Sequence, residues 1–145
     1  MRIGIFGGTF DPVHDGHVNP VARAAERFGL ARVIWIPARV SPLKGAPPTD
    51  ARHRVAMVAL AIDGRPDWVL SFDELDREPF VGQGLAIPEV AGLQNRLEVF
   101  DGGSFKISAT DLRTDLARGG SPAGRVPGPV AEYITKHRLY RGVEG

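Results

Sequence analysis

The chain contains no cysteine, and this absence removes several classes of chemistry. Without cysteine there is no disulfide, no thiolate metal site and no cysteine nucleophile. No apolar run approaches the roughly 18 residues of a membrane span, and Met1 and Arg2 lead directly into a strand pattern rather than a signal peptide. We therefore expect a cytoplasmic protein with no membrane partner.

Surplus charge is also scarce, since the formal net charge is only +1. A value so close to zero gives no broad electrostatic case for a nucleic-acid partner, although a local cationic pocket remains compatible with it. The hydrophobic share of 43% and charged share of 24% are ordinary for a globular protein. The length of 145 residues predicts a single domain, residues 1–145.

The first half of the chain alternates between strand and helix patterns. Short apolar segments predict strands at residues 2–6, 32–37 and 68–72. Helical spacing predicts one helix from about His17 to Gly29 and another from its N-cap Asp50 to about Gly64. This βαβαβ order favours an α/β fold, a Rossmann-like parallel sheet with flanking helices and right-handed crossovers.

The second half is harder to assign, and segment 73–103 is atypical. "LAIPEV" and "RLEVF" are each compatible with a strand, but no convincing helix pattern separates them, so the central portion is abbreviated. "KISATDLRTDLARGG" predicts a strand end entering a short helix, with Leu112 and Leu116 one turn apart. Gly128 and Pro129 open the last helix, with proline at its first position.

The stretch "GIFGGTFDPVHDGH" joins the first strand to the first helix. Gly7 and Gly8 allow a sharp turn and a close approach of a ligand to the backbone. The N-terminus of the following helix attracts phosphate through its free N–H groups and dipole. Thr9 adds a hydroxyl, and His14 and His17 add imidazole donors. The pattern predicts a phosphate site; a turn with solvated histidines is the alternative.

The sequence lacks the other common phosphate-binding motifs. There is no G-x-x-x-x-G-K-[ST], no G-x-G-x-x-G, and "GQG" at residues 82–84 lacks a following helix. A zinc site on His14 and His17 has little support, because the chain has no cysteine and no third ligand with a clear signature. We therefore expect no protein-held metal.

The chain resembles the family of nucleotidylyltransferases with an H-x-G-H motif. "GGTFDPVHDGH" looks like their signature, and "ISATDLR" is similar to the I-S-[SA]-T-x-[IL]-R motif of the bacterial nicotinate-mononucleotide adenylyltransferases. "IPARVSPLK", "ARHRVAMVALA" and "RVPGPVAEYITKHRLY" resemble further segments of that family, with Arg54 and Met57 in register. The resemblance covers residues 1 to about 70 and about 105 to 140.

The resemblance implies transfer of AMP from ATP to nicotinate mononucleotide, which gives nicotinate adenine dinucleotide and pyrophosphate. It implies catalytic roles for His14, His17, Lys44 and Arg113, with Lys44 also at the acceptor, and Mg²⁺ carried with ATP. The ATP-binding set that it implies consists of Gly7, Gly8, Thr9, Phe10, His14, His17, Ser108, Thr110 and Arg113. Helix capping is the alternative role for Ser108 and Thr110, and solvent exposure that for Lys44 and Arg113.

The chain departs from the family pattern in its middle. Leu43 stands where the family usually has histidine, and only 33 residues separate Glu74 from Ser108, where family members have the parts that hold the acceptor base. Three hypotheses follow: an adenylyltransferase acting on nicotinate mononucleotide, a relative with another acceptor such as phosphopantetheine, and a non-catalytic nucleotide-binding variant. Unless a segment of this region pairs with the first strand, its edge stays open and favours a homo-oligomer.

Overall fold

The structure, a computed structural model, describes residues 1–39, 49–73, 75 and 107–142. The expected strands in "LAIPEV" and "RLEVF", and the candidate residue Lys44, lie outside the described residues. Within them, the elements follow the order β1, α1, β2, α2, β3, α3, α4. None of the helices in these ranges is both long and apolar enough to cross a membrane.

The sheet confirms the predicted parallel α/β arrangement. It consists of β1 (Arg2–Gly8), β2 (Leu30–Pro37) and β3 (Trp68–Leu70), which pair in parallel in the order β1-β2-β3. In this register Phe6 lies opposite Trp35, and Trp35 lies opposite Leu70. β1 extends two residues beyond the predicted strand, and β3 ends two residues before its predicted end.

Two helices connect the strands and pack against the sheet. α1 (Asp15–Phe28) contacts β1 and β2, and α2 (Ala51–Ile62) contacts β2 and β3. Gly29 ends α1 in the left-handed region at φ 57°, and the Asp50 carboxylate caps α2 by accepting from the Arg52 N–H. Both boundary residues are the predicted ones, because only their local chemistry decides them.

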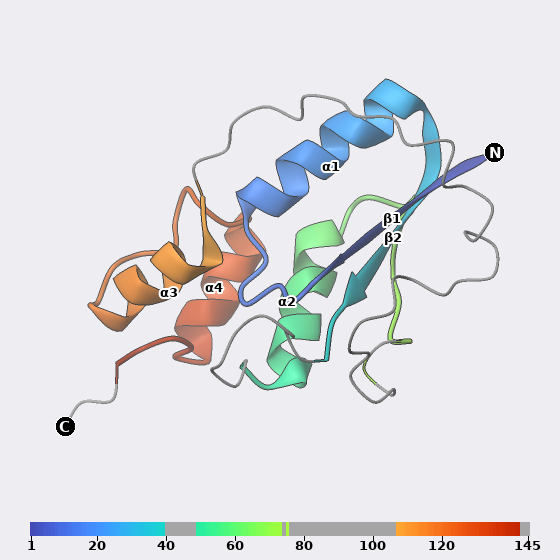
Figure 1. Cartoon of the computed structure of the whole chain (residues 1–145). Coiled ribbons are helices and arrows are strands. Elements are labelled where there is room, and N and C mark those ends of the chain that lie inside the picture. Colours follow the sequence, from blue (N-terminus) through green and yellow to red (C-terminus); the bar gives the residue numbers. More distant parts are fainter. Residues whose placement is uncertain (40–48, 74, 76–106, 143–145) are drawn as a thin grey trace.

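The last two helices lie at one end of the molecule (Figure 1). In α3 (Ala109–Ala117), Leu112 and Leu116 are buried as their spacing predicts, and in α4 (Gly128–Lys136) so are Val130 and Ile134. Proline occupies the second position of α4 rather than the first, since Pro127 serves as the N-cap. α4 packs against α2, which joins this end to the sheet.

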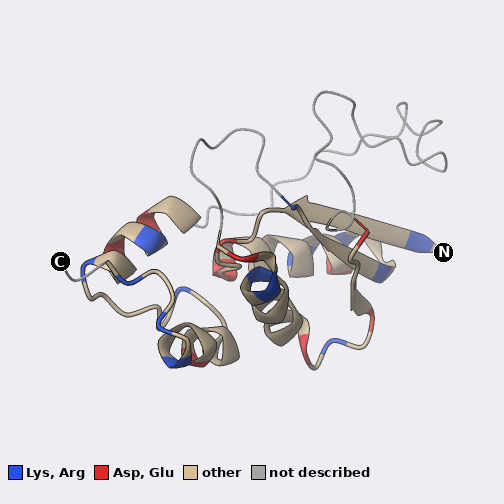
Figure 2. Cartoon of the chain, turned by 90° about the horizontal axis from the view of Figure 1, so that it is seen from below, with Lys and Arg blue, Asp and Glu red and all other residues tan. Residues whose placement is uncertain are grey.

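An aromatic cluster forms the centre of the core on one face of the sheet. The Trp35 ring is fully buried and lies 4.9 Å from Phe6, 5.4 Å from Phe10 and 5.2 Å from Trp68, measured between ring centroids. Both tryptophans of the chain therefore pack in the core. On the surface, basic and acidic positions are interspersed over the described elements (Figure 2).

Candidate nucleotide-binding site

The candidate site begins where β1 and β2 end together. Their carboxyl ends are held side by side, since the Ala38 N–H donates to the Gly8 carbonyl over 2.8 Å. Open α/β sheets bind ligands outside this edge. The turn that leaves β1 there carries Thr9, Phe10 and Asp11 and ends at His14, the N-cap of α1.

The structure corrects our expectation for the two glycines of this turn. Gly7 and Gly8 both remain in β1, and neither lies among the residues with positive φ; the turn is made instead at Phe10, with φ 51°. A Cβ on Gly8 would lie 3.0 Å from Cε1 of Phe10, so Gly8 makes room for that ring. Among the described residues, the nearest atom to a Cβ on Gly7 would be the Ile36 carbonyl oxygen at 3.7 Å, an ordinary contact distance.

The Phe10 side chain belongs to the core rather than to the surface of the site. It is only 2% exposed and packs edge-on against the His17 ring at 5.1 Å. A left-handed backbone at a residue other than glycine costs about 1–3 kcal/mol and persists only where its surroundings impose it. Here the buried ring supplies that constraint, and any contact of Phe10 with a nucleotide is left to its backbone.

His14 and His17 stack on each other at the start of α1. Their ring centroids lie 3.7 Å apart with an interplanar angle of 26°. The His14 backbone N–H donates to Nδ1 of His17 over 3.1 Å. A neutral imidazole carries one proton, so this bond places the proton of neutral His17 on Nε2. The same bond lets His14 serve as N-cap, which explains why α1 begins at Asp15 and not near His17 as predicted.

His14 is held neutral by burial. Its side chain is 5% exposed, and burial lowers its pKa from the ordinary 6.5 to about 4. Among the described residues no partner contacts its buried Nδ1 within hydrogen-bond distance. A buried, unpaired nitrogen is costly and is a candidate contact for a ligand. At neutral pH His14 is therefore suited to hydrogen bonding and not to charge neutralisation.

The N-terminus of α1 offers fewer free donors than predicted. The Asp15 N–H donates to the Arg125 carbonyl over 2.8 Å, and the His17 N–H donates to the His14 carbonyl over 2.9 Å. Of the first three N–H groups of the helix, only that of Gly16 has no partner among the described residues. A phosphate at this end would meet one backbone donor and the dipole of the helix.

The structure brings the second predicted motif against this turn. A Cβ on Gly16 would lie 2.9 Å from Nδ1 of His14 and 3.3 Å from the Ile107 carbonyl oxygen, so the segment before α3 touches the start of α1. Nη1 of Arg113 donates to the Asp11 carbonyl over 2.7 Å. Residues about 100 positions apart in sequence thus lie in contact at the end of β1; that they form one nucleotide site stays a prediction.

The alternative role of helix capping holds for Ser108. Its Oγ accepts from the Asp111 N–H over 3.1 Å at the N-terminus of α3. Thr110 is exposed and is the second residue of α3. Its Oγ1 accepts from Nη2 of Arg113 at 3.4 Å. Since a hydroxyl that accepts one bond still carries its own proton, capping leaves Ser108 able to donate to a phosphate.

Sequence reasoning assigned no role to three polar residues around the site: the buried Asp11 and Arg54 and the half-buried Tyr140. Arg54 is 1% exposed, and within the described residues its guanidinium donates to backbone carbonyls alone; burial lowers its pKa. Its acceptors are Thr9 at 2.8 Å, Ala38 at 2.6 Å, Arg39 at 2.9 Å and Thr49 at 2.8 Å. Arg54 thus joins the ends of β1 and β2 to the start of α2. Arg54 matches its counterpart in the family segment that the chain resembles. Nothing else in the local sequence distinguishes Arg54 from a solvent-exposed arginine on a helix.

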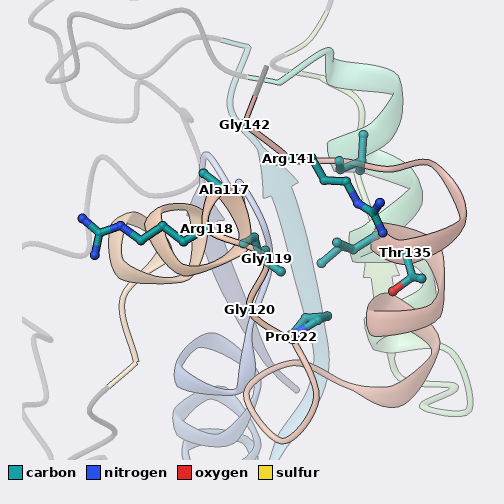
Figure 3. Close-up of a pocket in the computed structure, with 11 residues that line it drawn as sticks. Ala117, Arg118, Gly119, Gly120, Pro122, Thr135, Arg141 and Gly142 are labelled. Carbon is teal, nitrogen blue, oxygen red and sulfur yellow. The ribbon is translucent and has the colours of Figure 1, made fainter. Parts of the chain in front are cut away.

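A separate cavity of about 400 Å³ lies between the end of α3, α4 and the segment that follows α4 (Figure 3). None of its lining residues belongs to the candidate site. In Figure 3 the Arg118 side chain extends away from the other labelled residues, while Arg141 extends toward Thr135. In the parts of the chain that the structure describes, no group of three or more His, Asp or Glu side chains is placed to hold a metal ion.

Comparison with known proteins gives consistent matches. The model of the cytidylyltransferase-like family matches residues 5–99. A probable nicotinate-nucleotide adenylyltransferase of Bordetella petrii is 32% identical over 194 positions, covering 97% of this chain and 99% of the relative. One of Thermomicrobium roseum is 30% identical over 199 positions, covering 99% and 93%. One of Salmonella gallinarum is 47% identical over 73 residues, half of this chain and 34% of the relative.

The alignment length carries further information about the middle of the chain. The alignment with the Thermomicrobium roseum protein spans 199 positions, whereas this chain has 145 residues, so at least 54 aligned positions have no counterpart here. This chain is therefore shorter than that relative within the aligned region, in agreement with the few residues between Glu74 and Ser108.

Proposed function

The chain belongs to the cytidylyltransferase-like family of nucleotidyltransferases, and from this premise we propose that it transfers AMP from ATP to nicotinate mononucleotide. In this reaction a phosphate oxygen of the acceptor attacks the α-phosphorus of ATP, the bond to the β-phosphate oxygen breaks, and pyrophosphate leaves. The product is nicotinate adenine dinucleotide. Two relatives are named probable nicotinate-nucleotide adenylyltransferases, and these names support this choice of acceptor.

One observation carries the proposal: the two nucleotide motifs meet at the edge where β1 and β2 end. Gly16 is enclosed by His14 and Ile107, and Arg113 reaches the Asp11 carbonyl. This meeting surrounds the turn with imidazole, hydroxyl and guanidinium groups, while the one buried carboxylate among the described residues there, that of Asp11, already accepts two hydrogen bonds from the protein. Such a donor set suits phosphate.

The reaction needs no general base. A phosphate monoester has a second pKa of about 6, so the attacking group of the acceptor is already largely ionised at neutral pH. The protein then has to position the two substrates and stabilise the charge that develops on the transferred phosphate. In our proposal Nε2 of His17 donates to the α-phosphate, and His14, neutral through burial, adds a second hydrogen bond. ATP enters with its own Mg²⁺, and Ser108, Thr110 and Arg113 contact the outer phosphates.

A second candidate function is supported by the shortened middle. If the 54 or more missing positions include the pocket for the acceptor base, the chain binds MgATP but transfers AMP poorly or to another acceptor. Lys44, which we propose as a contact for the acceptor phosphate, would then lack a partner pocket. This candidate shares the ATP half of the site with the first and differs from it in the rate of transfer or in the acceptor.

Pyrophosphate release separates these candidates. The full chain is incubated with MgATP and, in parallel, nicotinate mononucleotide, nicotinamide mononucleotide, phosphopantetheine or no acceptor, and each product is identified by mass spectrometry. We expect pyrophosphate and nicotinate adenine dinucleotide in equal amounts. Release with phosphopantetheine alone, or MgATP binding without release in any arm, would contradict the proposal.

A further inference from the structure

Asp11 lies at the centre of the turn and is held by three different parts of the chain. Its Oδ2 accepts from the Thr49 N–H over 2.9 Å, and its backbone carbonyl accepts from Nη1 of Arg113 over 2.7 Å. Its Oδ1 accepts from the Tyr140 hydroxyl over 2.5 Å. The side chain is 6% exposed, so these bonds are protected from water. Asp11 therefore couples the start of α2, α3 and the segment after α4 to the turn between β1 and α1.

The segment after α4 adopts an unusual backbone in delivering Tyr140. Arg138 and Tyr140 have φ of 53° and 62°, in the left-handed region that residues with a Cβ rarely occupy. Leu139 and Arg141, which flank Tyr140, line the cavity beside α3 (Figure 3). Strain of this kind persists only where surrounding contacts impose it, and the bond to Asp11 is such a contact.

We propose that the bond from Tyr140 to Asp11 fixes the nucleotide-binding turn, which makes Tyr140 a positioning residue for ATP. The inference rests on the proposed function only for the identity of the ligand. Asp11 lies between Phe10, which makes the turn, and His14, which caps α1, and its carbonyl orients Arg113. Any displacement of Asp11 thus reaches both groups of ATP contacts at once.

The Tyr140 hydroxyl keeps its proton at neutral pH and so remains a hydrogen-bond donor. Burial, followed by the negative charge of Asp11, raises the pKa of Tyr140 far above its ordinary value. The hydroxyl therefore remains protonated, and the carboxylate that it contacts is an acceptor whenever it is ionised. Hydrogen bonds to charged groups are the stronger class of protein hydrogen bonds.

The two tyrosines of the chain offer a matched test. Tyr140→Phe removes the hydroxyl at Asp11, and Tyr133→Phe removes one that lies 2.8 Å from Nδ1 of His53. Both variants lose one hydroxyl of a half-buried tyrosine, and the hydroxyl of Tyr140 also contacts the Thr49 side chain. We expect Tyr140→Phe to weaken MgATP binding in calorimetry about tenfold, the order set by one bond to a charged group, and Tyr133→Phe to leave it unchanged.

The four histidines give a second readout that needs no substrate. His14 and His17 stack beside the turn, whereas His53 and His137 contact Tyr133, at ring distances of 5.8 and 4.2 Å. In nuclear magnetic resonance spectra, Tyr140→Phe should shift the imidazole signals of the first pair and Tyr133→Phe those of the second. A role of Tyr140 in stability alone would lower the melting temperature without this separation.

Gly142→Ala keeps the Tyr140 hydroxyl but displaces its segment, because the new Cβ would lie 2.9 Å from the Ala117 carbonyl oxygen. It should reproduce both effects of Tyr140→Phe and replaces that variant if Tyr140→Phe does not fold. Unchanged MgATP affinity and unchanged His14 and His17 signals would overturn the proposal. If wild type makes no dinucleotide, the proposed function fails, while the imidazole signals still decide the role of Tyr140.

Discussion

At the scale of single residues, the two histidines of the turn have different expected functions because their surroundings differ. His17 accepts a backbone N–H at Nδ1 and so presents its proton at Nε2, whereas His14 is buried with Nδ1 unpaired among the described residues. His17 is therefore the better placed donor to a phosphate that carries charge in the transition state.

We predict that His17→Ala lowers turnover far more than it lowers stability. Removing one donor to a transition-state charge costs on the order of 2.7–4 kcal/mol in other enzymes, or roughly 10²–10³ in kcat. Loss of the bond to the His14 N–H costs about 1 kcal/mol, as for a helix cap. Pyrophosphate release and thermal melting measure the two effects. The control is His137→Ala, at the exposed histidine that forms the C-cap of α4. Equal turnover in wild type and His17→Ala would contradict this role.

The burial of His14 predicts a pH dependence of stability. Its pKa is about 4 in the folded chain and about 6.5 when unfolded, so between these values the unfolded chain binds the extra proton more readily. The free energy of unfolding should therefore fall as pH decreases from about 6.5 to about 4, and His14 should contribute no slope above this window. In urea unfolding, His14→Gln should show a shallower dependence than wild type in this range; identical slopes would refute the assignment.

The residues that sequence patterns could identify are those whose chemistry is local. His14, His17 and Ser108 stand out because their types and spacing are unusual at the ends of predicted elements. Asp11 and Tyr140 could not be found in this way, since they are 129 positions apart and meet only in the fold. The assignment of the turn to Gly7 and Gly8 was wrong for a similar reason: the packing of the Phe10 ring, not glycine, determines the backbone there.

At the scale of elements, Arg54 connects three segments that surround the site. Replacement by methionine keeps the apolar stem of the side chain but leaves the carbonyls of Thr9, Ala38, Arg39 and Thr49 without this donor. We predict that Arg54→Met lowers the free energy of unfolding by more than about 3 kcal/mol, since each lost hydrogen bond to a charged group contributes roughly 1.5–3 kcal/mol.

Arg52→Met is the matched control in the same helix. The Arg52 side chain is 91% exposed and pairs only with the exposed carboxylate of Asp50, and surface pairs contribute little. Urea unfolding of both variants makes the comparison. Similar losses in the two variants would show that the carbonyl contacts of Arg54 do not hold the loops together.

The helices and strands of the first half could be predicted well because hydrophobic period and boundary residues agree there. The helix α1 starts two residues earlier than predicted, because His14 is its N-cap and the His14 N–H donates to Nδ1 of His17. Histidine is not among the residue types that usually mark an N-cap in a sequence. The parallel pairing of β1, β2 and β3 could be predicted from their alternation with helices. The neighbour of β1 on its other side could not be predicted, since no periodic pattern in segment 73–103 distinguishes strand from loop.

At the scale of the whole molecule, the part of the site proposed for ATP is better preserved than the part proposed for the acceptor. Both ATP motifs are present and meet in the fold, whereas the chain lacks at least 54 positions aligned in a relative. Among the described residues β1 pairs only with β2, and Ile3 and Ile5 on it are 47% and 42% exposed. Where no other segment of the chain covers this edge of β1, it can recruit a second chain.

We therefore predict weak acceptor selectivity together with self-association. The preference in kcat/KM for nicotinate over nicotinamide mononucleotide should be less than tenfold, or about 1.4 kcal/mol of discrimination. Light scattering over a range of concentrations should show dimers or larger species, and Ile5→Lys should favour the monomer because lysine on an edge strand opposes pairing. Ile62→Val, a substitution in the buried face of α2, is a control for a general loss of stability. A preference above tenfold in a sample that is monomeric at every concentration would mean that the short segment between Glu74 and Ser108 builds both a selective acceptor pocket and a neighbour for β1.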